Sequence, residues 1–167
     1  YFKEFAASTT ATGRKLLNLA KDFVEENYPG AETVYGDTDS VFINFNPKDE
    51  NGKKLIGKEA VKKSIELGLE VEERIKPLLK VPHKLEYEKT FWPFALMSKK
   101  RYVGNKYEMD ANKYKQTSMG IVLKRRDNAP IVKYIYGGVI DIIMNQQNLY
   151  KALHFWKDSL YQLLTGK

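Results

Sequence analysis

Two stretches rich in β-branched and aromatic residues, 32–35 and 41–45, are separated only by a short polar run that contains Asp37 and Asp39. Such stretches favour strands, and so short a break forces the chain to reverse at once, so the sequence predicts a β-hairpin. Hard cations such as Mg²⁺ prefer oxygen ligands and are commonly held by one or two carboxylates together with substrate phosphates. The hairpin tip is therefore a candidate metal site, although an Asp-Thr-Asp run on its own is more often an Asx-type turn.

Helical spacing of apolar residues recurs in further segments of the chain. The first ends at Pro29-Gly30, which is a strong stop signal, and Pro130 suits the first turn of a later one. Asp127 or Asn128 is expected to cap that later helix, and the spacing in the last segment is expected to bury Trp156. The predicted helices cover residues 5–28, 58–75, 131–144 and 149–164.

Extended structure is predicted between the second and third of these helices. Residues 83–91 alternate in polarity as a strand does, and residues 94–107 are expected to form a further extended pair that turns at Gly104-Asn105. We expect these strands to join the hairpin in one antiparallel sheet of three or four strands. The predicted fold class is therefore α+β, with helices packed on an antiparallel sheet and a mostly helical C-terminal third.

The composition excludes several kinds of protein. The 167 residues include no Cys and only two His, so disulfides and thiolate chemistry are excluded and we expect no zinc site. No apolar run approaches about 18 residues, so we expect no membrane partner and a location inside the cell. Because the chain begins at Tyr1 rather than Met, we expect it to be a piece of a longer protein.

The net charge of +7 is concentrated in one third of the chain. Residues 79–134 hold 13 Lys and Arg against 5 Asp and Glu, whereas the rest of the chain holds 15 against 16. Such a concentration is the electrostatic footprint of a surface that binds a polyanion, because each neutralised phosphate releases condensed counterions. A solvated lysine-rich surface is the alternative that composition alone leaves open.

Two basic motifs lie within this third. In the first, Lys99, Lys100 and Arg101 are followed by Tyr102, and the run is expected to lie in a strand whose alternation sends Lys100 and Tyr102 to one face. A cation and a ring on one face can hold a sugar-phosphate backbone. The second motif, 124–126, is Lys-Arg-Arg just ahead of a predicted helix, where arginine forks can pair with phosphate oxygens.

The order of the acid pair and the two basic motifs resembles the C-terminal palm and the start of the thumb of family B DNA polymerases. Residues 35–40 match the family's motif C, and residues 6–14 look like the helix that leads from the fingers into the palm. Residues 99–102 match the Lys-Lys-Arg-Tyr motif that grips primer-template DNA, while Gly120 and residues 125–130 match the segment that opens the thumb. The sequence of residues 119–127 is similar to that of polymerases of large DNA viruses, particularly algal and giant viruses.

The resemblance implies a domain organisation and a role for each motif residue. Residues 1–116 would be part of the palm, and residues 117–167 the beginning of the thumb. Asp39 and Asp37 would be the catalytic and metal-binding acids of a two-metal Mg²⁺ site. The residues near the primer end and the nucleotide would be Tyr35, Gly36, Thr38 and Ser40, and those that hold DNA would be Lys99, Lys100, Arg101, Tyr102, Gly104, Gly120, Lys124, Arg125 and Arg126.

The implied partners are primer-template DNA, deoxynucleoside triphosphates and the remainder of the polymerase chain. For a viral enzyme, the implied location is the host nucleus or a cytoplasmic replication site. Two positions depart from many cellular members, Met119 where Lys is common and Val122 where Glu is common. The family's other metal-binding aspartate and its Lys-rich fingers helix are not in this sequence, so we expect the chain to be inactive by itself.

Two other classes of function are compatible with parts of the sequence. Metal-dependent glycosyltransferases also carry Asp-x-Asp at a strand end, but they need little surface for a long polyanion. A stand-alone nucleic-acid-binding module, in which the two acids are only structural, would explain the basic motifs without any chemistry. Salt-dependent binding to primer-template would argue against the first alternative, and metal dependence of that binding would argue against the second.

Overall fold

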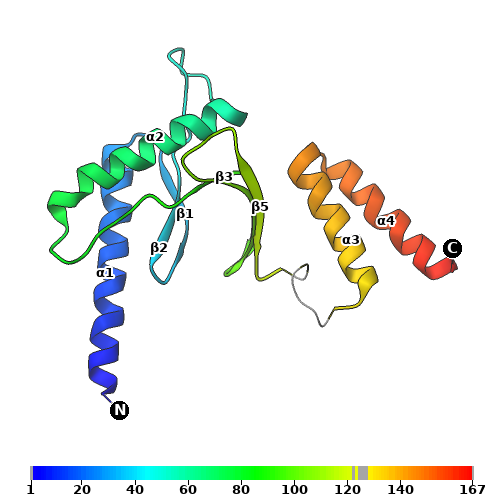
Figure 1. Ribbon diagram of the computed structural model, residues 1–167, viewed down its shortest axis with the longest axis horizontal. Coiled ribbons are helices and arrows are strands. Elements are labelled where there is room, and N and C mark those ends of the chain that lie inside the picture. The colour runs from blue at the N-terminus through cyan, green and yellow to red at the C-terminus, as the bar shows by residue number, and fades with distance from the viewer. Residues whose placement is uncertain (1, 122, 124–127, 167) are drawn as a thin grey trace. The chain divides into compact units, whose positions relative to one another are not determined.

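The computed structural model describes residues 2–121, 123 and 128–166 and has an α+β fold, as the sequence predicted (Figure 1). Within those residues the strands form a two-stranded sheet, β1-β2, and a three-stranded sheet of order β3-β4-β5. No helix in the described part is long and apolar enough to cross a membrane. The elements are α1 (Lys3–Asn27), β1 (Glu32–Asp37), β2 (Ser40–Asn44), α2 (Gly57–Ile75), η1 (Lys76–Leu78), β3 (Thr90–Ser98), β4 (Arg101–Tyr107), β5 (Tyr114–Met119), α3 (Pro130–Asp141), η3 (Ile142–Gln146) and α4 (Leu149–Thr165).

The chain divides into two compact units, of which the first comprises Tyr1–Thr90 and Tyr107–Lys113. In this unit the hairpin β1-β2 lies beside the C-terminal half of α1, and α2 packs on the same helix (Figure 1). The core between them contains Val24, Tyr28 and Val71, because apolar residues of α1 recur at helical spacing on one face. This packing gives the hairpin a fixed base.

A polar cluster around Arg74 joins α1 to α2 at the edge of that core. The Arg74 guanidinium donates to Glu70 Oε1 at 3.3 Å and to Asn27 Oδ1 at 3.1 Å, and the Tyr28 hydroxyl donates to the same Glu70 oxygen at 3.0 Å. Arg74 also lies over the rings of Phe23 and Tyr28, at 5.8 and 5.1 Å from their centroids. Burial raises the pKa of the Tyr28 phenol, and the hydrogen bond to Glu70 raises it further.

The second unit comprises Phe91–Lys106 and Tyr114–Lys167. Its core contains Val103 of β4, Ile121, Ile140 of α3 and Met144 of η3. The helices α3 and α4 lie side by side (Figure 1), and they meet closely at Gly138, where an added Cβ would overlap the ring of Phe155. The absence of a side chain at Gly138 therefore permits this close packing of the two helices.

The helix predictions are confirmed with shifts of up to three residues at their ends, and the strand predictions are partly wrong. Residues 83–89 have no regular structure, and the strand begins only at Thr90. Gly104 and Asn105 do not form a turn, because they lie inside β4, and the turn falls at Lys99-Lys100 instead. The hairpin does not share a sheet with the later strands.

Gly104 is a position in β4 where a side chain would not fit. A Cβ there would lie 2.8 Å from the ring of Phe91, 3.0 Å from the carbonyl oxygen of Pro93 and 3.2 Å from the ring of Phe94. A glycine inside a strand often marks such a close approach.

Two predictions concern the ends and faces of the C-terminal helices. The N-cap position of α3 is Ala129, one residue later than predicted; of the two predicted capping residues, Asp127 lies outside the described residues, and a cap from Asn128 stays a prediction. The predicted burial of Trp156 is wrong. Trp156 is 44% exposed, because Phe155 rather than Trp156 faces α3, where its ring lies 5.7 Å from that of Tyr134. The helix-opening role of Pro130 is confirmed.

Candidate active site

The two acids lie at the tip of the hairpin β1-β2. Asp37 pairs with Ser40 as the last residue pair of the ladder, so that only Thr38 and Asp39 form the loop. The Asp39 N–H donates to the Asp37 carbonyl oxygen at 2.5 Å and closes a very tight turn around Thr38. Thr38 has a positive φ of 46°, which a β-branched residue rarely adopts. Strained backbone of this kind tends to occur at functional sites.

Side-chain hydroxyls hold the tip in this conformation. The Thr38 hydroxyl donates to Asp37 Oδ1 at 3.2 Å, and the Ser40 hydroxyl donates to the Asp37 carbonyl oxygen at 3.2 Å. Asp37 is half-buried, whereas Asp39 is exposed to solvent. The carboxylate of Asp37 is therefore oriented by its neighbour, and that of Asp39 is accessible from outside.

A β-bulge lies just below the tip. The register shifts between Thr33 and Tyr35, which leaves Val34 as the extra residue of β1. Above the shift, Tyr35 pairs with Phe42, and their rings lie 5.3 Å apart. A bulge increases the local twist and is frequent near active sites, where it redirects the following side chains. Sequence reasoning missed this feature, because nothing at Val34 marks it.

The donor set at the tip fits a hard divalent cation but is small. Asp37 and Asp39 offer only oxygen atoms, which are the ligands that Mg²⁺ prefers. Within residues 2–121, 123 and 128–166, no three His, Cys, Asp or Glu side chains gather closely enough to hold a metal ion. The tip thus supplies part of a coordination shell.

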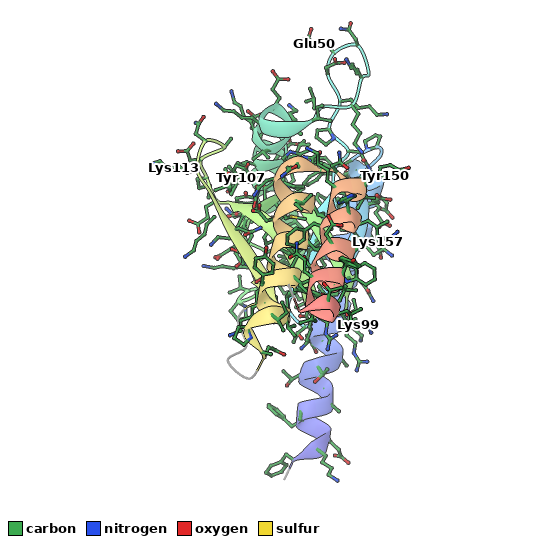
Figure 2. The ribbon with its side chains drawn as sticks, turned by 90° about the vertical axis from the view of Figure 1, so that its right-hand side faces the viewer. Glu50, Lys99, Tyr107, Lys113, Tyr150 and Lys157 are labelled. Atoms are coloured by element: carbon green, nitrogen blue, oxygen red, sulfur yellow. The ribbon has the colours of Figure 1, made fainter. Side chains whose placement is uncertain are left out.

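The first basic motif lies at the turn between β3 and β4, in the second unit. Lys99 and Lys100 form the turn itself, and Arg101 begins β4; all three are exposed, and Lys99 is labelled in Figure 2. Lys100 has a positive φ of 61°. The prediction that Lys100 and Tyr102 share one face of a strand is therefore wrong, because Lys100 is not in a strand.

Tyr102 and Gly104 lie inside the second unit. Tyr102 is 5% exposed and packs against the rings of Phe91 and Phe94, whose centroids lie 5.9 and 5.5 Å from its own. Gly104 makes room for the same two rings. Both residues thus support the strand from which the basic turn projects, and a contact between either of them and DNA stays a prediction.

Gly120 follows β5 directly and lies against the basic turn. Its φ is +64°, and an added Cβ would fall on the carbonyl oxygen of Lys100 and 3.1 Å from Arg101 Cγ. The sequence could not show this contact, because the two segments are far apart along the chain. The predicted DNA-binding residues Lys124, Arg125 and Arg126 lie outside the described residues.

Comparison with known proteins identifies relatives along the whole chain. A family model described as DNA polymerase family B matches residues 1–166. A DNA polymerase of Pyramimonas orientalis virus is 59% identical over 167 residues, which is 100% of this chain and 14% of that protein. A DNA polymerase of Acanthamoeba polyphaga mimivirus is 46% identical over 136 residues, covering 81% of this chain and 8% of that protein.

A cellular relative gives the same result at lower identity. The DNA polymerase delta catalytic subunit of Caenorhabditis elegans is 32% identical over 174 residues, covering 98% of this chain and 15% of that protein. The similarity to polymerases of large DNA viruses is confirmed, and the chain spans only a small part of each relative's length. Because the family model covers nearly every residue, this chain belongs to DNA polymerase family B.

Proposed function

We propose that the chain is the C-terminal part of the palm, residues 1–116, and the beginning of the thumb, residues 117–167, of a template-directed DNA polymerase. The enzyme would add deoxynucleoside triphosphates to a primer 3′ end and release pyrophosphate. The observation that carries this proposal is the strained hairpin tip with Asp37 and Asp39, in a chain that the family model matches over residues 1–166. Family membership removes the glycosyltransferase alternative.

Asp39 and Asp37 would hold Mg²⁺ in this proposal. When bound, two such ions activate the primer 3′-hydroxyl and neutralise the triphosphate. The chain's own contribution is geometric, because Thr38 orients the Asp37 carboxylate and the short loop fixes Asp39 beside it. A further aspartate from another part of the polymerase would complete the site, as the family resemblance implies.

The residues around the two acids would contact the substrates. Tyr35, Gly36, Thr38 and Ser40 would lie near the primer end and the incoming nucleotide. Lys99, Lys100 and Arg101 would bind phosphates of the primer-template duplex, and Lys124, Arg125 and Arg126 would bind phosphates farther along it. Contacts with phosphates do not recognise the bases, so DNA binding is expected to depend steeply on salt and not on the DNA sequence.

The test is primer extension by the full-length polymerase with Asp39→Asn. This change keeps the shape of the side chain and removes its charge, so we expect a loss of several orders of magnitude in kcat with unchanged thermal unfolding. Asp22→Asn, on the exposed side of α1, is the matched control and should leave kcat unchanged. The proposal is wrong if the Asp39 variant extends primers at the rate of the unaltered enzyme.

A second measurement addresses the predicted incompleteness. The isolated chain should show no primer extension, because one hairpin supplies only part of a two-metal site. For a viral enzyme, the proposed location is the host nucleus or a cytoplasmic replication site. Extension by the isolated chain would refute the prediction that it depends on the remainder of the polymerase.

A further inference from the structure

Two residues with left-handed backbone conformations meet in the second unit. Lys100, at the turn between β3 and β4, has a φ of 61°, and Gly120, directly after β5, has a φ of 64°. An ideal Cβ at Gly120 would overlap the Lys100 carbonyl oxygen and lie 3.1 Å from the Lys100 carbonyl carbon. The obstacle is backbone rather than the end of a flexible side chain, so it could not simply move aside. A glycine is therefore favoured at position 120 for two reasons, the positive φ and the lack of room for a side chain.

The turn that Gly120 touches carries an exposed cluster of positive charge. Lys99, Lys100 and Arg101 are all exposed, while Tyr102, the next residue, is buried among aromatic rings. The turn is thus anchored on one side by the sheet and on the other by the backbone at Gly120. A left-handed Lys is unfavourable by itself and persists only where the surrounding structure fixes it.

We propose that Gly120 is a positioning residue for DNA binding. Its missing side chain lets the chain after β5 press against Lys100, and this contact holds the backbone from which Lys99, Lys100 and Arg101 reach phosphates. The inference rests on the proposed polymerase function, and it replaces the view of Gly120 as a direct DNA contact. It predicts that a change at Gly120 weakens DNA binding although no charge is removed.

The chain provides a matched control for backbone conformation. Gly57, at the start of α2, has the same φ of +64°, but nothing lies within 4 Å of a Cβ placed there. Gly57→Ala therefore introduces a Cβ at the same positive φ without a collision. Any effect of Gly120→Ala that exceeds that of Gly57→Ala comes from the contact with Lys100.

The experiment measures the affinity of the full-length polymerase for primer-template DNA as a function of salt. A plot of the logarithm of the association constant against the logarithm of the salt concentration has a negative slope. Replacing Lys99 and Lys100 together by Ala should make this slope shallower by about 2, because each ammonium group that no longer neutralises a phosphate reduces its magnitude by about 1. Gly120→Ala should make the slope shallower by about 1 to 2 and should weaken binding about tenfold or more at low salt. The kcat at saturating DNA should be retained. Gly57→Ala should leave both quantities unchanged.

Combining the changes separates positioning from a general loss of structure. If Gly120 acts through the turn, Gly120→Ala should weaken binding less in the variant that already lacks Lys99 and Lys100 than in the unaltered polymerase, because only Arg101 of the turn remains to be displaced. Effects that multiply, or a Gly120→Ala variant that binds like Gly57→Ala, would overturn the inference. If the unaltered polymerase extends no primer, the proposed function has failed instead.

A second variant covers the case in which Gly120→Ala does not fold. Inserting one glycine between Lys99 and Lys100 keeps every charge and lengthens only an exposed turn, which sheets usually tolerate. It should reduce the DNA affinity and the salt slope as Gly120→Ala does. Unchanged affinity in this folded variant would show that the conformation of the turn does not matter for binding.

Discussion

Replacing Gly138 by Ala tests whether the contact between α3 and α4 is as close as the structure shows. Ala favours a helix over Gly by about 1 kcal/mol, so the substitution would stabilise α3 if there were room. There is none, because the added Cβ would overlap Cε1 and Cζ of Phe155 and lie 3.2 Å from its Cδ1. Overpacking of this kind typically destabilises by about 1–3 kcal/mol.

Gly13, inside α1, supplies the reference, because nothing lies within 4 Å of a Cβ placed there. Gly13→Ala should stabilise α1 by about 1 kcal/mol. The gain in helix propensity is common to both substitutions, so the difference between them, about 1–3 kcal/mol, isolates the collision with Phe155. The net effect at Gly138 therefore ranges from none to a loss of about 2 kcal/mol.

Native-state hydrogen exchange is the appropriate assay, because it reports the local stability of α1 and of α3 separately within a larger protein. Gly13→Ala should slow the exchange of amides in α1, whereas Gly138→Ala should leave unchanged or speed the exchange of those in α3 and α4. Truncating the ring by Phe155→Ala in the Gly138→Ala background should reveal a coupling of about 0.5–3 kcal/mol. Equal stabilisation by both glycine substitutions would refute the packing at Gly138.

Three further predictions concern the first unit. Arg74→Lys keeps the charge but loses the planar fork, so amides at the contact of α1 and α2 should exchange faster, while Arg14→Ala, at an exposed site of α1, should leave that exchange unchanged. Thr38→Val removes the hydroxyl that orients Asp37, so primer extension by the full-length enzyme should fall about 10- to 100-fold, whereas Thr38→Ser should retain the rate. Burial raises the pKa of the Tyr87 phenol above 10.0, so the folded protein keeps this proton at a pH where the unfolded chain loses it. The free energy of unfolding, measured with urea, should therefore fall above pH 10.0, and it should fall less in Tyr87→Phe.

Features that depend on neighbours along the chain were predictable from the sequence. Helix α2 was predicted within one residue of its start, since its apolar residues repeat at helical spacing and Pro77 follows its end. The hairpin was predictable because two strand-forming runs flank a polar pair too short for anything but a turn. The family resemblance rested on the same local motifs, and the family match confirms it.

Features that depend on packing between distant segments were not predictable. Gly104 is of a residue type common in turns, yet it lies in β4, where the rings of Phe91 and Phe94 occupy the space that a side chain would need. Lys99 and Lys100 have no turn signal, yet they form the turn. Helical spacing put Trp156 on an apolar face, but the position against Gly138 belongs to Phe155. In each case the deciding partner comes from another element.

The two motifs that the family resemblance singled out share a conformational feature. Thr38 and Lys100 each occupy the tip of a hairpin with a positive φ, where Gly or Asn would be relaxed. Two other non-glycine residues in the described part have this conformation. Asn46 is of a type that tolerates it, and its N–H donates to Asn44 Oδ1, whereas Gln147 is the C-cap of η3, a position where left-handed residues are common. Thr38 and Lys100 lie at hairpin tips, and they are residue types for which this conformation is unfavourable. A glycine at either tip would relieve that strain. At position 38 it would remove the hydroxyl that orients Asp37, and at position 100 it would remove an ammonium group from the turn that we propose to bind DNA. The proposed roles of these side chains are therefore consistent with residues that backbone preference alone would disfavour.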